Sequence, residues 1–347
     1  MTHAIESAAY AAEDGAGWTT LGQPLTAEEA RDPKLIAAKL NLLWTVEANP
    51  IYRRDKYGNY VQIPDYAAQT RSDTGDALSI TSDNRYHTTN RQPMDVLEAF
   101  RDDFAKQSLR MTHAASLMGG SLIVCAAVMP KEFDIVVGKG DRLQSFVTLS
   151  TGYDKKHGTK ATKGTIRVVC WNTLMASIYA AMKQRTIKTV RASTELEFDT
   201  LKGLIDKVRD LHAEERVRYT ELANREVGDA ELLRYFADVL EIRVEDLGKV
   251  DRNGDKLVST KSENMLTALK TAYVSGRGAA VAHGSMWGAL NAVTHYATWD
   301  KTVRDMQGDG KNSAKVTSNL FGDAGRLKAR ALELALKRAN SQVLVAA

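Results

Sequence analysis

The segment from Ser145 to Arg191 most constrains the fold of this chain, because it contains two short β-branched runs separated by a basic, glycine-containing stretch. Residues 146–150 and 166–170 are apolar and β-branched, which is typical of strands. The glycines between them favour a loop. A helix is expected to begin at Leu174, with the side-chain oxygens of Asn172 and Thr173 accepting hydrogen bonds from its first turn. The segment therefore predicts a strand, a basic loop, a strand and a helix in succession.

Positive charge is concentrated in this part of the chain. Residues 151–191 contain nine Lys or Arg and one acid, Asp154, which gives a net charge of +8, whereas the whole chain carries +4 and the remainder is therefore −4. A local basic stretch is typical of contact with a polyanion, although a solvated loop has the same composition. Charge alone does not distinguish DNA, RNA and an acidic protein surface.

The basic stretch supplies most of the candidate binding residues. Its Lys and Arg side chains can neutralise phosphates, and the amides of the helix expected after Asn172 can hold one more. Tyr153, His157 or Trp171 can stack on a base. The charged turn at Arg71 can add a contact to the same face, but such a turn between strands is more often only a turn. The predicted nucleic-acid-binding residues are Lys155, Lys156, His157, Lys160, Lys163, Arg167, Asn172, Thr173, Lys183, Arg185, Arg71 and Tyr153.

The order of the predicted elements indicates an α+β fold with three parts. Residues 1–24 are expected to be an arm, residues 25–191 an α+β core with the basic loop, and residues 192–347 a helical region. The core is expected to be an antiparallel meander with packed helices. Its predicted strands lie on either side of a turn at residues 56–59, over 78–81, over 122–128, and in a hairpin around the glycine turn at 138–141. Beyond Arg191 amphipathic helical patterns dominate, so the C-terminal half is expected to be all-α.

Composition is that of an ordinary soluble globular protein, with 44% hydrophobic and 26% charged residues among 347. Cys125 and Cys170 both lie in apolar runs, which favours buried free thiols in a reducing cytoplasm over a disulfide or a metal site. The N-terminus lacks the pattern of a signal peptide, and no apolar run approaches the length of about 18 residues that a membrane span needs. We therefore expect a cytoplasmic protein without a membrane contact.

No motif indicates catalysis, a cofactor or a metal. Residues 251–262 resemble the start of an EF-hand loop, but Lys256 stands where Gly is needed and Ser262 where Glu is needed. The run at 308–312 lacks the spacing of a phosphate loop, and the seven His show no metal-ligand spacing. We therefore expect a protein without enzymatic activity, cofactor or metal; a nuclease would need acids clustered near the loop, where only Asp154 lies.

Several pieces of the sequence resemble the phage/plasmid-like protein family, a family without an established activity that is carried by phages, prophages and plasmids. The most specific piece is Arg-Val-Val-Cys-Trp-Asn-Thr-Leu at 167–174, in which Trp171 occupies a position where a polar residue is expected. The resemblance covers roughly residues 15–340 and implies a bacterial host cell. The other matching pieces are Trp18 with Leu21-Gly22, Thr70–Gly75, Gly152–Asp154 with Gly158, and Trp287 with Asn291–Thr294.

A weaker analogy of architecture is to the single-strand annealing recombinases of the Red-beta type, because a meander followed by a helix with basic residues at the junction looks like their core. Those proteins form rings or filaments and bind phosphates in a basic groove. Our hypothesis is therefore a homo-oligomeric protein that binds single-stranded DNA and anneals it in recombination. The alternative is an anti-host or regulatory factor whose basic loop binds an acidic protein.

Overall fold

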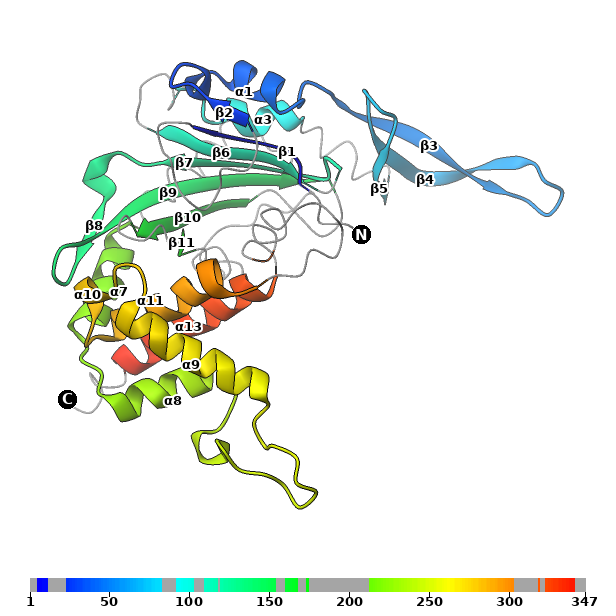
Figure 1. Cartoon of the computed structure of the whole chain (residues 1–347). Coiled ribbons are helices and arrows are strands. Elements are labelled where there is room, and N and C mark those ends of the chain that lie inside the picture. Colours follow the sequence, from blue (N-terminus) through cyan, green and yellow to red (C-terminus); the bar gives the residue numbers. More distant parts are fainter. Residues whose placement is uncertain are drawn as a thin grey trace.

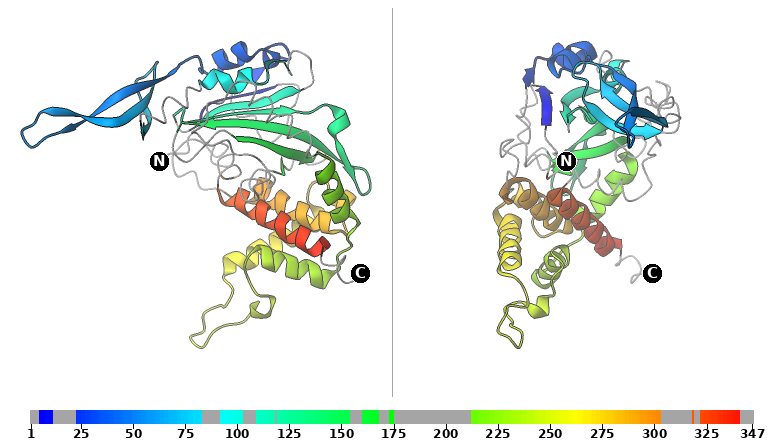
Figure 2. Two further views of the ribbon diagram at one scale, coloured as in Figure 1. Left: turned by 180° about the vertical axis from the view of Figure 1, so that it is seen from behind. Right: turned by 90° about the vertical axis from the view of Figure 1, so that its right-hand side faces the viewer.

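The computed structural model describes residues 5–11, 23–82, 92–102, 109–117, 119–153, 160–167, 173–174, 212–302, 318 and 322–340. The fold is α+β: a mixed sheet of eight strands and a separate antiparallel sheet of three strands are combined with helices on both sides of the larger sheet (Figure 1). The smaller sheet lies at one end of the larger one and carries a hairpin that projects away from the body, as a view from behind also shows (Figure 2).

The larger sheet is mostly antiparallel. Its strand order is β11-β10-β9-β7-β6-β1-β2, and only β1 and β2 run parallel. Strand β8 pairs with residues 141–143 of β9, before the stretch that pairs with β7. The meander over β6, β7, β9 and β10 confirms the antiparallel arrangement that the sequence predicted. The strands are β1 (Ile5–Ala11), β2 (Gln23–Leu25), β6 (Arg110–Leu117), β7 (Leu122–Val128), β8 (Ile135–Val137), β9 (Asp141–Gly152), β10 (Lys160–Arg167) and β11 (Thr173–Leu174).

The prediction that a helix begins at Leu174 is wrong. Thr173 and Leu174 form β11, in which they pair with Ile166 and Thr165 of β10. Pairing with a neighbouring strand satisfies the backbone groups of Thr173 that a helix cap would otherwise have used. Leu174 is therefore a strand residue and not the start of a helix, so the proposed phosphate site has no helix N-terminus at this position.

The basic loop is shorter than predicted. Strand β9 continues to Gly152 and β10 already begins at Lys160, so residues 160–167 pair with β9 along their whole length. A long neighbouring strand overrides the weak strand preference of Lys and Gly, because every added pair satisfies further backbone groups. The N-terminal segment also differs from a simple arm, since β1 pairs with β6 in the large sheet.

The smaller sheet consists of β3 (Val46–Arg54), β4 (Tyr60–Arg71) and β5 (Ala77–Ser82), and it confirms the predicted turn at residues 56–59. Strand β5 pairs only with residues 66–70 of β4. Between Pro50 and Tyr52 the register shifts, and opposite this bulge Asp65 has a positive φ of 61°. Residues 51–65 continue beyond the bulge as a two-stranded ribbon, which we call the finger.

The helices of the N-terminal half cover one face of the large sheet (Figure 1). A 3₁₀ turn, η2 (Glu29–Arg31), precedes α1 (Pro33–Lys39), and α3 (Pro93–Glu98) packs beside them. Asp32 caps α1 by accepting a hydrogen bond of 2.8 Å from the backbone N–H of Lys34. The core between these helices and the sheet includes Ile36, Leu97, Phe100, Met111, Ile123, Cys125, Val147 and Leu149.

Beyond residue 211 the regular elements that the structure describes are helical, with two isolated β-bridges besides. They form a second core on the other side of the large sheet, which Ile135, Val137 and Leu143 of the sheet join. The helices are α7 (His212–Asn224), α8 (Asp229–Val239), η4 (Val244–Asp246), α9 (Thr260–Ser275), α10 (Ala279–Ala282), α11 (Met286–His295), the π-helical turn η5 (Tyr296–Asp300) and α13 (Asp323–Asn340).

A buried hydrogen bond joins helix α11 to the large sheet. The indole Nε1 of Trp287 in α11 donates to Oδ2 of Asp141, the first residue of β9, over 2.7 Å, and both side chains are almost fully buried.

Cys125 is a buried free cysteine in β7, and burial raises the pKa of its thiol because the thiolate is poorly solvated there. Within the described residues, no helix has both the length and the apolar character needed to cross a bilayer.

Candidate nucleic-acid interface: the finger and its junction with the sheet

The base of the finger meets the large sheet in a small cluster that we call the junction, formed by Trp44, Arg71, Asp73, Gly120 and Tyr153. Arg71 ends β4 and Asp73 lies in the turn before β5. Gly120 lies in the turn between β6 and β7, and Tyr153 directly follows β9. Arg71, Asp73 and Tyr153 come from two of the sequence pieces on which the family resemblance rests, so the tertiary structure brings these separate pieces together.

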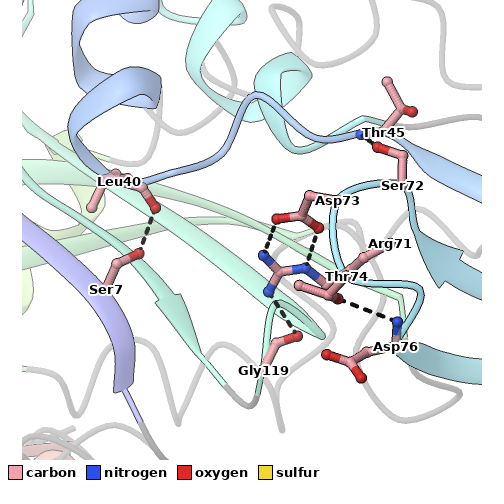
Figure 3. Close-up of polar contacts among 9 residues, drawn as sticks. All are labelled: Ser7, Leu40, Thr45, Arg71, Ser72, Asp73, Thr74, Asp76 and Gly119. Atoms are coloured by element: carbon pink, nitrogen blue, oxygen red, sulfur yellow. Dashed lines mark hydrogen bonds and ion pairs between the residues drawn. The ribbon is translucent and has the colours of Figure 1, made fainter.

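Arg71 is the centre of the junction (Figure 3). Its Nε donates to Oδ1 of Asp73 over 2.9 Å and its Nη2 donates to Oδ2 over 2.7 Å, while Nη1 donates to the backbone oxygen of Gly119 over 3.4 Å. The Arg71 side chain is 3% exposed and that of Asp73 is 30% exposed. The hydrogen bonds from Arg71 lower the pKa of the Asp73 carboxyl, because they stabilise its ionised form.

The ring of Trp44 packs against the guanidinium of Arg71. The Arg71 guanidinium carbon lies 4.5 Å from the centroid of the Trp44 ring, a cation–π contact. Gly120 fits against both groups: a Cβ atom at this position would lie 2.8 Å from Cζ2 of Trp44 and 3.1 Å from Nη1 of Arg71. Its φ of +87° is also one that residues with a side chain rarely adopt. The close approach of the β6–β7 turn to the junction therefore needs glycine.

Tyr153 ties the end of β9 to the base of the finger. Its ring packs edge-on against Trp44, with 6.1 Å between the ring centroids. Its backbone N–H donates to the oxygen of Ser121 over 2.8 Å, and its backbone oxygen accepts from the hydroxyl of Ser79 in β5 over 2.6 Å. The chain therefore leaves β9 next to the smaller sheet, directly before the basic residues that follow Tyr153.

Two further pairs of hydrogen-bonded residues fix the chain around the junction (Figure 3). Thr45 and Ser72 bond reciprocally, since the Thr45 N–H donates to the Ser72 hydroxyl oxygen over 2.8 Å and the Ser72 N–H donates to the Thr45 oxygen over 2.9 Å. The hydroxyl of Ser7 in β1 donates to the backbone oxygen of Leu40 after α1, over 2.7 Å. Helix α1, strand β1 and the β4–β5 turn are thereby connected around the same end of the sheet.

The predicted roles of Arg71 and Tyr153 do not fit this arrangement. The guanidinium of Arg71 is buried and bonded to Asp73 and Gly119, so contact with a phosphate would require breaking the ion pair. Tyr153 is 5% exposed and its ring lies against Trp44, so neither face is open to a base. Both residues hold the finger and the end of β9 in place instead.

The finger itself presents a group of exposed side chains in a segment for which the sequence predicted a hairpin but no binding role. Residues 52–60, which we call the fingertip, contain three tyrosines, three cations and one acid. The exposed fractions are 54% for Tyr52, 76% for Tyr57 and 73% for Tyr60. The density of Tyr, Arg and Lys in nine residues, a quarter of all 12 tyrosines in the chain, was the available sequence signal. Isolated turns rarely need such large rings.

The cations of the fingertip lie next to its rings. The guanidinium carbon of Arg54 is 5.5 Å from the centroid of the Tyr60 ring, and Nζ of Lys56 is 4.8 Å from that of Tyr57. The one acid, Asp55, is bonded within the turn: its Oδ1 accepts from the N–H groups of Tyr57 (2.8 Å) and Asn59 (2.9 Å). These backbone bonds, that of Asn59 foremost, lower the pKa of Asp55.

The other predicted site residues divide into two groups. In β10, Lys160 pairs with Ser150, Lys163 with Val147 and Arg167 with Leu143. Lys160 and Lys163 therefore belong to a strand of the large sheet and not to the loop that the sequence predicted. The remaining predictions, apart from Thr173 in β11, lie outside the described residues: Lys155, Lys156, His157, Asn172, Lys183 and Arg185.

Among the residues that the structure describes, no group of three or more His, Cys, Asp or Glu is arranged to hold a metal ion. The loop at 251–255 illustrates this. Oδ1 of Asp251 accepts hydrogen bonds from the backbone N–H groups of Asn253 and Asp255, at 2.8 and 2.9 Å, so the carboxylate stabilises its own turn.

A comparison with protein-family models matches residues 77–320 to the Domain of unknown function (DUF932). This match covers most of the chain, and the protein therefore belongs to the DUF932 family. The curated proteins and the solved structures contain no significant match to the chain.

The matched region begins at β5, so the finger and Arg71 lie before it, whereas Gly120 and Tyr153 lie within it. The junction thus connects the family domain to a segment that precedes it in the chain.

Proposed function

We propose that this protein binds single-stranded DNA at the end of the large sheet from which the finger and the basic stretch both extend. By analogy with the Red-beta-type proteins, we propose that it anneals strands in recombination of a phage or plasmid, without enzymatic activity, in the cytoplasm of a bacterial host. The C-terminal half, proposed to be helical throughout, would pack subunits of a homo-oligomer, a ring or a filament, or recruit partners.

The supporting observation is the position of two basic segments at one junction. The backbone oxygen of Tyr153 accepts a hydrogen bond from Ser79 of β5, so Lys155 and Lys156 follow within three residues of the base of the finger. The finger adds Arg53, Arg54 and Lys56 in an exposed ribbon. Cations from segments about 100 residues apart in sequence are thereby attached to the same end of the sheet, which suits a polyanion longer than either segment.

A salt series tests the proposal. Binding of a labelled single strand, the matching duplex and an RNA strand of the same sequence is measured by fluorescence anisotropy at increasing salt. A variant with Lys155, Lys156, Lys160 and Lys163 changed to Ala is expected to bind the single strand more weakly. Its slope of log K against log salt is expected to be smaller by up to about 3, since each neutralised phosphate contributes about 0.7 for single strands.

The matched control removes the same charge elsewhere. Lys34, Lys249, Lys261 and Lys270 are exposed on other elements, and changing these four to Ala should leave the salt slope near that of the wild type. Equal losses in both variants would indicate a general charge effect. No binding of any of the three nucleic acids at low salt rejects the proposal and favours the alternative, a factor that binds an acidic protein.

A further inference from the structure

We propose that the fingertip binds the bases of a single strand by stacking, with Tyr52 and Tyr60 holding a base between their rings. The inference rests on the proposed function and assigns to the finger a role different from phosphate neutralisation. It defines a binding element for unpaired bases on a part of the chain that lies before the matched family domain.

The first argument is the exposure of the rings. Tyr52 and Tyr60 lie beyond the bulge, where the finger has only two strands and β5 no longer pairs with it. A two-stranded ribbon has no core in which large side chains can be buried, and both rings remain more than half exposed. Large exposed apolar surface is typical of binding sites, because it costs solubility without stabilising the isolated fold.

The second argument is the placement of the two tyrosines on one face of the ribbon. Tyr52 pairs with Gln62 and Arg54 pairs with Tyr60, so Tyr52 and Tyr60 occupy diagonal positions on the same face. The backbone positions of diagonal neighbours in an antiparallel pair are about 7–8 Å apart. A base stacked between two rings needs about twice the 3.4 Å that separates stacked bases along one strand, so two rings that rise in parallel from these positions can hold one base. Such a sandwich requires an unpaired base, which a duplex does not offer.

The third argument is charge complementarity. Arg53, Arg54 and Lys56 against Asp55 give the fingertip a net charge of +2, and two of these cations lie over tyrosine rings. The carboxylate of Asp55 accepts backbone hydrogen bonds within the turn, which pre-organises the tip around it. A base stacked on Tyr60 would therefore have Arg54 beside it, within reach of the flanking phosphate. An acidic protein would satisfy the cations but would not need the stacked geometry.

The test compares two double variants. Tyr52→Thr with Tyr60→Thr removes both rings and keeps a residue that favours strands. Tyr52→Phe with Tyr60→Phe keeps the rings. Binding of a labelled oligothymidylate strand and of an abasic strand of equal length is measured on the full-length protein. The expected loss for oligothymidylate is about 5- to 150-fold per base stack in the Thr variant, with an unchanged salt slope, and less than about threefold in the Phe variant.

The abasic strand separates stacking from other contacts. It should bind the wild type about as weakly as oligothymidylate binds the Thr variant, and the Thr substitutions should not weaken it further. The control variant Gln62→Thr changes the same face without removing a ring and should bind as the wild type does.

If the Thr variant binds oligothymidylate as tightly as the wild type does, the inference is overturned while the proposed function stands. An equal loss for the abasic strand also overturns it, because the rings would then contact the backbone or a protein surface. If the wild type binds no nucleic acid, both the inference and the proposed function are rejected.

Discussion

Arg71 and Asp73 form an ion pair with two parallel hydrogen bonds, and the arginine is the buried partner: 3% of its side chain is exposed, against 30% for Asp73. The pair closes the β4–β5 turn, and the same guanidinium reaches Gly119 and Trp44. One side chain thus connects the small sheet, the β6–β7 turn and the segment before β3. The orientation of the finger relative to the large sheet depends on this connection.

Removing Arg71 should destabilise the protein. We expect Arg71→Ala to lower the free energy of unfolding by about 2–3 kcal/mol, less than the 3–5 kcal/mol of a fully buried pair because Asp73 keeps part of its hydration. Arg71→Lys should recover little of this, since an ammonium cannot make the two parallel bonds. Urea unfolding measures the change. The pair of Arg326 and Asp323, in which both side chains are more than half exposed, provides a control, Arg326→Ala, whose cost should stay below about 0.5 kcal/mol. If Arg71→Ala lowers the free energy of unfolding no more than the control does, Arg71 does not hold the finger to the large sheet.

The ion pair should also make stability depend on pH. The folded-state pKa of Asp73 lies below its ordinary value of 3.8, so the folded protein favours the ionised carboxyl. The resulting stabilisation is fully present above about pH 5 and is lost as the pH falls below about 4, through the folded-state pKa. The difference in unfolding free energy between wild type and Asp73→Asn should therefore shrink in that range. When both proteins also carry Arg71→Ala, the difference in unfolding free energy that Asp73→Asn causes should depend much less on pH. A difference between wild type and Asp73→Asn that stays constant down to pH 2 would contradict the ion pair.

Gly120 and Gly140 offer a matched pair of substitutions, because both have φ of +87° but only at Gly120 would an added Cβ atom have neighbours within 4 Å. Gly→Ala at either position introduces a similar backbone strain, about 1–2 kcal/mol. Gly120→Ala must in addition displace Trp44, so we expect it to cost about 1–3 kcal/mol more than Gly140→Ala. Thermal unfolding of the two variants measures this difference. Equal losses of stability in the two variants would mean that the Trp44 side chain moves aside at no measurable cost.

The hydrogen bond between Trp287 and Asp141 should couple the helical region to the sheet. Trp287→Phe keeps an aromatic ring but removes the Nε1 donor from a buried carboxylate, and we expect a loss of about 2–4 kcal/mol from the lost bond and the smaller ring. Trp299 is only partly buried and packs against Arg277, so Trp299→Phe should cost less than about 1 kcal/mol. Hydrogen exchange of β9 and α11 should rise together in Trp287→Phe, and an increase confined to α11 would argue against coupling.

The finger should contribute little to the stability of the body. Replacing residues 52–62 with a two-residue Asn-Gly turn removes an exposed ribbon without a core, so the midpoint of urea unfolding should shift by no more than the equivalent of about 0.5 kcal/mol. Nucleic-acid binding should weaken in the same variant. A large loss of stability would show that the finger has a structural role as well.

The strands of this protein were largely predictable because local patterns agree with the final pairing. Leu122–Val128 is apolar throughout and forms the central strand β7, and the glycine turn before Asp141 produces the β8–β9 hairpin. The start of β10 was not predictable because Lys160 has a weak strand preference of its own and lies in a strand only beside β9. The two residues of β11 were not predictable because Asn172 and Thr173 before Leu174 also fit the pattern of a helix cap, and only the pairing with β10 decides for a strand. The helix expected at Leu174 failed for the same reason.

The sequence by itself determined the α+β class, the meander and the concentration of charge in one stretch, since these follow from local periodicity and composition. Only the tertiary structure decided that Arg71 and Tyr153 are buried, that the end of β9 lies beside β5, and that the tyrosines of the fingertip project from the body. Burial depends on residues distant in sequence: Arg71 is enclosed by Trp44 and Gly119, and the contacts that enclose a side chain leave no periodic signal in its own segment.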